Sequence, residues 1–323
     1  MASLGIGCAM ESFPRDEIPG EVRAALRGAG LPEVVKCSLI KVSFHATYIV
    51  ELAAPPAKVV VQLLGSQIGD KAIFRPDRPI SAGSIERASS LAREAGIRVP
   101  DVLATGLVEE WGCLRDLPFV AYEFIETETV EDEVTAPGEE LHRVIGDICQ
   151  AFGARPLTDV DTEPVQRFES VAEFIAQLKA LAAEAEAAEL SSALDELSAE
   201  FEGIEPKAPV LIHQDLNDGN VLCSRNPDGS GSWRLDALID WEGAAVADPR
   251  LAWERGEPWA SLRLVSKAVR CRWLTTAAAK GGAASAALPR CQLEELCEDY
   301  DEFGEQLVRA KRVSKLEALP KWL

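Results

Sequence analysis

The sequence predicts an α+β fold with two lobes, a small N-terminal lobe built on an antiparallel sheet and a larger, mainly helical C-terminal lobe. Three observations support this prediction. Short β-type runs occupy residues 37–63, helical periodicity dominates beyond residue 140, and an acidic stretch at 126–133 separates the two patterns. We therefore expect the lobes to comprise residues 1–125 and 126–323.

The N-terminal elements follow from local signals. Three runs rich in β-branched and aliphatic residues predict an antiparallel meander, with a turn at Pro55–Pro56. These runs cover residues 37–42, 47–52 and 58–63. Apolar residues recur at helical spacing from 84 to 95, and Gly96 and Pro100 are typical of a helix end. A strand pair follows, whose second member is expected at 119–125.

Beyond the acidic stretch the pattern changes to helix. Helical periodicity covers residues 140–154 and a long segment, 169–201, which we expect to break near Leu190. One β-rich island interrupts this half, and the turn residues at 226–231 predict a hairpin within it. The strands of the island are expected at 210–213, 220–223 and 235–239.

Composition excludes several classes of protein. The 323 residues are 47% apolar and 27% charged, which is typical of globular proteins and excludes disorder and fibres. A net charge of -20 argues against nucleic-acid and anionic-membrane binders, because both use clustered Lys and Arg. The eight cysteines and three histidines lack zinc-ligand spacing, and no run approaches the length of a membrane span. We expect a cytoplasmic protein with reduced thiols.

The β-rich island carries the most informative string, which runs from His213 to Leu222. Asp215 and Asn220 share one loop, and Asp240 ends the strand that returns from the hairpin. Phosphoryl transfer needs a carboxylate that orients the attacking group and accepts its proton, together with oxygen ligands that hold Mg²⁺ against a triphosphate. The pattern therefore predicts Asp215 as catalytic base and Asn220 and Asp240 as Mg²⁺ ligands.

His213–Leu222 and Ile239–Ala244, with Asp248–Pro249 after them, resemble the aminoglycoside phosphotransferase and choline kinase family of small-molecule kinases. The resemblance spans about residues 35–260 and implies a protein-kinase-like fold. It implies Mg²⁺, with ATP or GTP as co-substrate, and transfer of the γ-phosphoryl group to a hydroxyl of a small metabolite or antibiotic-like acceptor. It also implies that adenine contacts the hinge backbone at Glu123 and Ile125.

The resemblance weakens at the phosphate end. Gln62 stands where the family usually has Lys or Arg, so Glu86, at the position of the helix glutamate, lacks an ion-pair partner. Glu86 is then either a hydrogen-bond partner of Gln62 or a solvated helix residue. The turn at 43–47 contains no glycine that would let the backbone approach a phosphate. Three lysines are candidates for the missing charge: Lys41, Lys58 and Lys71.

Two functions are consistent with these observations. The intact Asp215, Asn220 and Asp240 favour an active small-molecule kinase. Gln62 and the glycine-free turn favour a catalytically weak, pseudokinase-like binding or regulatory protein. The oligomeric state is not indicated by the sequence.

For some residues near this string, the sequence indicates a structural role or leaves the role open. We expect His213 to shape its loop through backbone hydrogen bonds, and Asp248 to cap a helix. The net charge, Glu242 and the acidic run at 294–302 are consistent with a cationic acceptor, but equally with charge that serves solubility alone.

Overall fold

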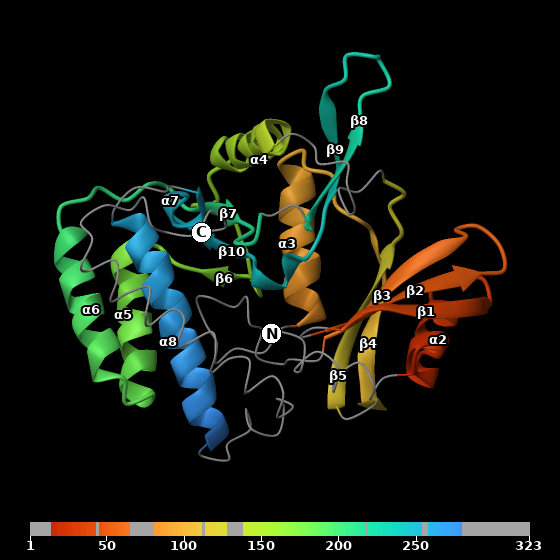
Figure 1. Cartoon of the computed structure of the whole chain (residues 1–323), viewed down its shortest axis with the longest axis horizontal. Coiled ribbons are helices and arrows are strands. Elements are labelled where there is room, and N and C mark those ends of the chain that lie inside the picture. The colour runs from red at the N-terminus through yellow and green to blue at the C-terminus, as the bar shows by residue number, and fades with distance from the viewer. Residues whose placement is uncertain are drawn as a thin grey trace.

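The computed structural model describes residues 14–42, 45–64, 81–111, 114–127, 138–216, 219–253 and 258–279. Figure 1 shows a sheet at one end of the molecule, a group of long helices at the other, and a helix and a β-hairpin between them. The mixed α+β, kinase-like fold expected from the sequence is confirmed. The proposed boundary after residue 125 stays a prediction.

The first sheet has five strands, in the order β1-β2-β3-β5-β4, and every neighbouring pair is antiparallel. The meander predicted from residues 37–63 is therefore confirmed. The strands are β1 (Val34–Val42), β2 (Ala46–Leu52), β3 (Lys58–Leu63), β4 (Val102–Trp111) and β5 (Leu114–Glu123). Buried and half-buried residues alternate along β2 and β3, as expected for strands whose two faces meet different surroundings.

One face of this sheet packs against α2 (Gly20–Gly28). Val22 and Leu26 of the helix are buried with Tyr48 and Phe119 of the sheet. The opposite face carries half-buried side chains, which belong to Ile49, Val60, Gln62 and Tyr122. Because partners opposite each other in an antiparallel pair point to the same face, the register places these four side by side.

Helix α3 (Ala82–Glu94) packs beside this second face (Figure 1). It begins two residues before the predicted start, because Ser81 is its N-cap: Ser81 Oγ accepts a hydrogen bond from the Ser84 N–H at 3.1 Å. Gly96 follows the helix with φ +83°, the left-handed conformation that glycine adopts most easily. The predicted helix end is confirmed.

The second half is mainly helical. Its elements are α4 (Gly138–Gly153), β6 (Gln166–Arg167), α5 (Val171–Glu184), α6 (Ala188–Glu200), β7 (Val210–Ile212), β8 (Val221–Arg225), β9 (Trp233–Leu238), η1 (Trp241–Gly243), β10 (Ala245–Ala247), α7 (Arg250–Trp253) and α8 (Trp259–Ala279). Strands β8 and β9 form the predicted antiparallel hairpin. The short strands β6, β10 and β7 form a separate sheet.

The break predicted within the segment 169–201 is confirmed, but it lies a few residues before Leu190. The chain breaks between α5 and α6, where Glu186 has φ 56°. Leu190 instead lies within α6 and is buried in the core that α5, α6 and α8 share. A left-handed residue ends a helix, and nothing in the Ala/Glu composition of this stretch marks Glu186 as that residue.

A second core links the sheet to the helical half. It contains Ile85 of α3, Val120 of β5, Ile148 of α4 and Trp241 of η1. Leu211 of β7 and Val221 of β8 belong to the same core, so the loop between these two strands is held by packed elements on both sides. In the described part of the chain, no helix is long and apolar enough to cross a membrane.

Several sequence predictions lie outside the described residues. These are Lys71, the first residues of the 43–47 turn, most of the acidic stretch at 126–133, and the acidic run at 294–302.

Candidate active site

Asp215 and Asn220 lie on the loop that connects β7 to β8. Asn220 Nδ2 donates to Asp215 Oδ2 at 2.7 Å and to the Asp215 main-chain oxygen at 2.9 Å. Both of these atoms are acceptors, so the amide must present its nitrogen to them. The planar amide group then directs Oδ1 away from Asp215.

The residue before Asp215 has an uncommon backbone conformation. Gln214 has φ 77°, which costs a non-glycine residue of order 1–3 kcal/mol. Such conformations persist where surrounding contacts over-determine the loop, and they are concentrated at functional sites. The conformation of Gln214 is thus consistent with a loop built to aim Asp215.

His213 holds this loop to the end of the hairpin. Its Nε2 lies 2.7 Å from the main-chain oxygen of Ile239, and its Nδ1 lies 3.4 Å from the Asp215 N–H. The ring of Trp241 packs edge-on against the imidazole, with 4.6 Å between ring centroids. A ring that donates through Nε2 and accepts through Nδ1 satisfies both backbone groups. The prediction that His213 shapes the loop is confirmed.

Asp240 lies next to Asn220 because the hairpin brings its two ends together. Val221 pairs with Leu238, and the Ile239 N–H donates to the Asn220 main-chain oxygen at 3.0 Å. Asp240 has φ 72° and ψ 61°, a left-handed conformation that Asp tolerates better than most residues. The structure therefore brings the three residues Asp215, Asn220 and Asp240 together.

A Mg²⁺ ion fits the donors at this point. Mg²⁺ is held in proteins by one or two side-chain oxygens together with water and substrate phosphates. Asn220 offers an amide oxygen directed away from Asp215, and Asp240 offers a carboxylate. Within the described residues, no cluster of three His, Cys, Asp or Glu side chains could hold a metal alone.

Glu242 and His45 form a contact that the sequence did not suggest. His45 Nε2, from the turn before β2, lies 3.4 Å from Glu242 Oε1, and both side chains are buried. Burial, followed by the negative charge of Asp240, raises the pKa of Glu242 to about 7, and His45 opposes this shift. Burial and then the charges of Glu242 and Asp240 raise the pKa of Tyr122 well above its ordinary range.

This contact decides a question that the sequence left open. Glu242 was consistent either with an acidic surface for a cationic acceptor or with charge that serves solubility, and its side chain is only 1% exposed. Residues after Asp240 turn into the 3-10 helix η1, which places Glu242 against His45. A buried carboxylate cannot line an acceptor surface.

Apolar side chains form the floor beside the hinge. Ile125 packs with Leu222 of β8 and Ala237 of β9, and Ile239 packs against this group. Sequence reasoning placed Ile125 near adenine but missed the other three. The apolar alternation of the hairpin strands was the available signal, but only the tertiary structure shows that this face meets the hinge.

Glu123 takes part in backbone and side-chain contacts at the end of β5. Its N–H donates to the Asp101 main-chain oxygen at 2.8 Å, and its carboxylate lies 3.6 Å from the guanidinium of Arg98. Leu238 of the hairpin donates its N–H to the Arg98 main-chain oxygen at 2.9 Å. The start of the hinge is thereby tied to the segment that precedes β4.

Gln62 and Glu86, the two residues expected near the nucleotide phosphates, do not form a polar contact in the described structure. Gln62 is half-buried on the second face of the sheet, opposite Thr47 and Val120. Glu86 is exposed on α3, and within the described residues no hydrogen bond joins it to Gln62. This placement favours the solvated reading of Glu86.

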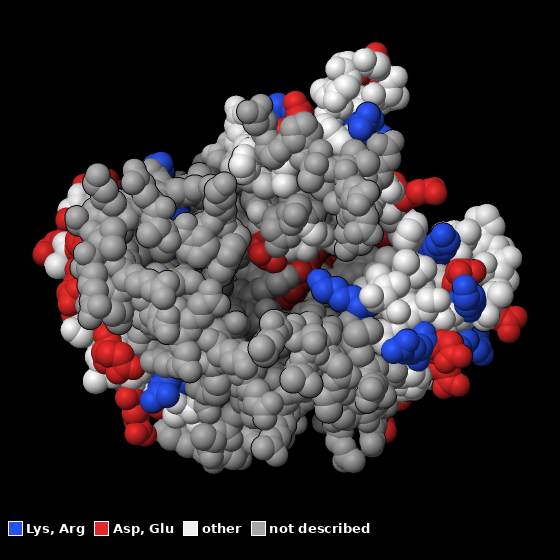
Figure 2. All heavy atoms as spheres, viewed as in Figure 1, with Lys and Arg blue, Asp and Glu red and all other residues white. Residues whose placement is uncertain are grey.

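The candidate replacement lysines give no clear substitute. Lys41 is exposed, and the Lys58 ammonium lies 5.2 Å from the centre of the Phe124 ring. Figure 2 shows Asp and Glu side chains near the centre of this face, with a Lys or Arg side chain beside them.

Comparison with known proteins adds a family and a fold. The model of the phosphotransferase enzyme family matches residues 46–251. A thermostable mutant of aminoglycoside phosphotransferase APH(4)-Ia, in complex with AMP-PNP and hygromycin B, is 15% identical, with a TM-score of 0.56 over 94% of this chain and 100% of that one. A protein from Ralstonia eutropha JMP134, described as an aminoglycoside phosphotransferase, is 12% identical, with a TM-score of 0.51 over 90% of this chain and 99% of that one. No curated protein matches the chain.

Proposed function

The chain belongs to the phosphotransferase enzyme family, and from this membership we propose that it transfers the γ-phosphoryl group of ATP or GTP to a hydroxyl group of a small molecule. The observation that carries the proposal is the placement of Asp215, Asn220 and Asp240 around the two ends of one hairpin. A carboxylate base and two oxygen ligands in this arrangement supply the groups that phosphoryl transfer requires.

In the proposed mechanism, Asp215 orients the acceptor hydroxyl and accepts its proton. A bond forms between the acceptor oxygen and the γ-phosphorus, and the bond from that phosphorus to the β–γ bridging oxygen breaks. The amide of Asn220 holds Asp215 through one carboxylate oxygen and the main chain, so the base reaches the acceptor in a defined orientation. General-base catalysis of this kind contributes about 10²–10⁴ in rate.

Asn220 and Asp240 would hold Mg²⁺ in this mechanism. When bound, the ion neutralises charge on the phosphate oxygens. The contribution of the chain is to fix these two side chains next to each other, through the hairpin register and the hydrogen bond from Ile239 to Asn220.

The purine is proposed to lie against the hinge. The apolar side chains of Ile125, Leu222 and Ile239 would cover one face of the ring, and the hinge backbone from Glu123 to Ile125 would supply its hydrogen bonds. An apolar surface with a few backbone polar groups at its edge is the usual composition of a small-molecule site.

A pseudokinase-like binding protein is the alternative. It is favoured by the neutral side chain of Gln62 and by the exposure of Glu86, since neither supplies the charge pair that usually holds the phosphates. The intact arrangement of Asp215, Asn220 and Asp240 favours the enzyme, because a protein that only binds nucleotide does not need the base.

For the acceptor, only a chemical class is proposed. A small hydroxylated molecule is consistent with the family, and the complex of APH(4)-Ia with hygromycin B suggests that amino-sugar antibiotics belong in a test panel. The net charge of -20 would favour a cationic acceptor in solution. The burial of Glu242 removes one of the local arguments for that preference.

Nucleotide consumption with a panel of acceptors tests the proposal. ATP and GTP are each supplied with Mg²⁺, and phosphorylated product is identified by mass. We expect acceptor-dependent consumption that is lost in Asp215→Asn. Saturable Mg²⁺-nucleotide binding without transfer to any acceptor would instead support the pseudokinase-like alternative, and the absence of nucleotide binding would contradict both.

A further inference from the structure

We propose that Asp236 is a positioning residue for the nucleotide, which fixes the segment after the hinge to the β8–β9 hairpin. The inference rests on the proposed function, because it concerns the geometry between the purine end and the metal end of the same site. Asp236 lies in the middle of β9, two residues before Leu238 and four before Asp240, and it is not among the residues predicted from the sequence.

Asp236 is a buried acid with defined partners. It is 6% exposed, and its Oδ2 accepts hydrogen bonds from Thr127 Oγ1 at 3.0 Å and from Ser224 Oγ. Arg234 lies 3.4 Å from its other oxygen. Burying a carboxylate is unfavourable unless hydrogen bonds compensate. These contacts give Asp236 a fixed orientation, with one oxygen directed at the hydroxyl of Thr127.

The Thr127 hydroxyl lies within reach of both strands of the hairpin and shares its single proton between two acceptors. Its Oγ1 lies 3.0 Å from Asp236 on β9 and 2.9 Å from the main-chain oxygen of Cys223 on β8. Thr127 is only two residues beyond Ile125, which packs on Leu222 and Ala237 of the same two strands. Polar and apolar contacts therefore fasten the hinge segment to the hairpin side by side.

The same hairpin carries the proposed metal ligands at its ends. Asn220 directly precedes β8, and Asp240 follows β9 after one residue. The hairpin therefore connects two parts of the proposed site. The metal ligands lie at its open end, and the residues that pack against the hinge lie within its strands. Asp236 is the polar connection between this hairpin and the hinge.

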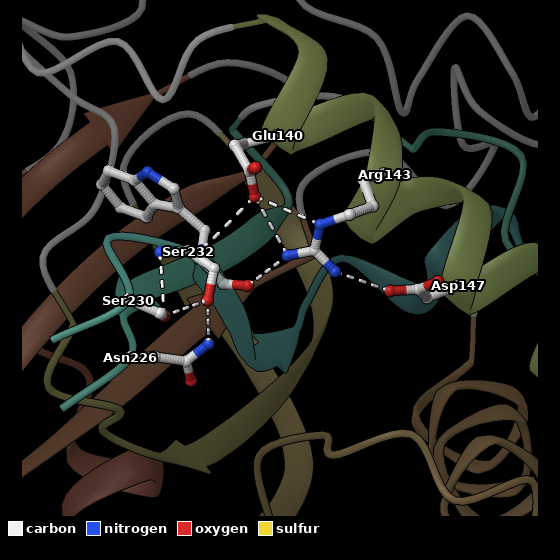
Figure 3. Close-up of polar contacts among 7 residues, drawn as sticks. Glu140, Arg143, Asp147, Asn226, Ser230 and Ser232 are labelled. Atoms are coloured by element: carbon white, nitrogen blue, oxygen red, sulfur yellow. Dashed lines mark hydrogen bonds and ion pairs between the residues drawn. The ribbon is translucent and has the colours of Figure 1, made fainter. Parts of the chain in front are cut away.

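A separate set of contacts anchors the hairpin near its turn. Figure 3 shows Arg143 of α4 between Glu140 and Asp147, with hydrogen bonds that reach the hairpin. The Arg143 guanidinium donates to the Trp233 main-chain oxygen, and the Trp233 N–H donates to Glu140 at 3.4 Å. Because α4 already holds the hairpin in place, loss of the Thr127 contact should displace the hinge rather than the hairpin.

This arrangement makes a specific prediction about binding. If the hinge shifts while the hairpin stays, contacts to the purine weaken and contacts to the phosphates through the metal ligands do not. A merely structural role would lower stability and weaken both kinds of contact together. The separation of purine binding from phosphate binding is therefore the informative measurement.

The experiment uses the full chain and two probes, adenosine and Mg²⁺-tripolyphosphate, with affinities measured by calorimetry. Thr127→Val keeps the shape of the side chain and removes its hydroxyl, and Asp236→Leu keeps the approximate size of the acid and removes the acceptor of the Thr127 hydroxyl. Thr105→Val, on an exposed position of β4, is the matched control. In each test variant we expect adenosine to bind about threefold to tenfold more weakly, with Mg²⁺-tripolyphosphate unchanged and the control unaffected.

Each outcome distinguishes the inference from the proposed function. Equal weakening of both probes, or wild-type affinity for adenosine in Thr127→Val, overturns the positioning role and leaves the proposed function standing. Failure of the wild-type protein to bind either probe overturns the proposed function, and the inference with it. If Asp236→Leu does not fold, Thr127→Val alone decides, because it leaves the buried acid and its Ser224 contact in place.

Discussion

Asn220 holds Asp215 from two directions with one nitrogen atom, which lies 2.7 Å from the Asp215 carboxylate and 2.9 Å from its main-chain oxygen. The residue proposed to bind the metal is therefore also the residue that orients the proposed base. The two functions of the loop are coupled by geometry, and substitutions at these positions must be chosen so that one function changes at a time.

Asp215→Asn should abolish most turnover while leaving nucleotide binding nearly unchanged. Asparagine can still accept the hydrogen bond from Asn220 through its amide oxygen, so the loop keeps its shape, but it cannot take the proton of the acceptor. We expect kcat to fall by about 10²–10⁴, with the nucleotide Kd within about twofold of wild type. Steady-state kinetics and calorimetry measure the two quantities. Asp159→Asn, in an exposed turn, is the control, and wild-type turnover in Asp215→Asn would exclude the base role.

Asp240→Asn should remove the Mg²⁺-dependent part of nucleotide stabilisation. Asn tolerates the left-handed conformation of Asp240, so the hairpin end should be retained while one ligand charge is lost. In wild-type protein, Mg²⁺-nucleotide at 100 times its Kd should add about 2.7 kcal/mol to the free energy of unfolding. Thermal unfolding with Mg²⁺ or with a chelator measures the difference. An Mg²⁺-dependent shift equal to that of wild type would refute the metal assignment.

Gln62→Lys should tighten nucleotide binding. Gln62 lies half-buried on the sheet face that carries Val60 and Tyr122, and a Lys there would direct a charge toward the phosphates. A charged hydrogen bond contributes about 1.5–3 kcal/mol, although exposure of Glu86 leaves the new ammonium without its usual partner. Gln62→Met, which has similar length and no charge, is the control. Weaker binding of ATP in Gln62→Lys would show that another group already holds the phosphates.

Asp248→Asn should destabilise the fold and reduce its sensitivity to acid. The carboxylate accepts hydrogen bonds from the Arg250 guanidinium at 2.7 and 2.9 Å and from the backbone N–H groups of Arg250 and Lys207. Burial raises the pKa of Asp248, but these hydrogen bonds outweigh it and leave the pKa below the ordinary value. The predicted capping role is confirmed, since Asp248 Oδ1 accepts a hydrogen bond from the N–H of Arg250, the first residue of α7.

The sign of the acid effect follows from this lowered pKa. In the unfolded chain the pKa of Asp248 is about 3.9, and in the folded chain it is lower. The folded protein therefore binds this proton only at a lower pH than the unfolded chain does. The stabilisation is therefore complete above about pH 5 and is lost as the pH falls below 4. Asp248→Asn should cost about 1.5–3 kcal/mol at pH 7 and flatten this acid loss. Chemical unfolding at a series of pH values tests it, with Asp195→Asn in an exposed ion pair as a control expected to change stability by under about 1 kcal/mol. Equal losses in the two variants would contradict the prediction.

The strands and the loop between β7 and β8 could be predicted because their signals are local. The β-type runs at 37–63 became β1 to β3, and the string from His213 to Leu222 became the loop that brings Asp215 to Asn220. A strand is marked by side chains that alternate between its two faces, and a hairpin by the residues of its turn. Both signals depend only on residues that are close together in the sequence. The helix break was predicted a few residues too late, because Glu186 adopts its left-handed conformation in a stretch with no glycine to mark the position.

By itself, the sequence determined the class of fold and the residues with the chemistry of phosphoryl transfer. Only the tertiary structure decided which of them meet. It buried Glu242 against His45, left Glu86 exposed on α3, and joined Asp236 to Thr127 across 109 positions of the chain. Such contacts depend on how distant elements pack, and the sequence carries no periodic signal for a pair that far apart. Local sequence patterns therefore indicate which residues carry the chemical groups, and the packing of distant elements determines which of these residues are in contact.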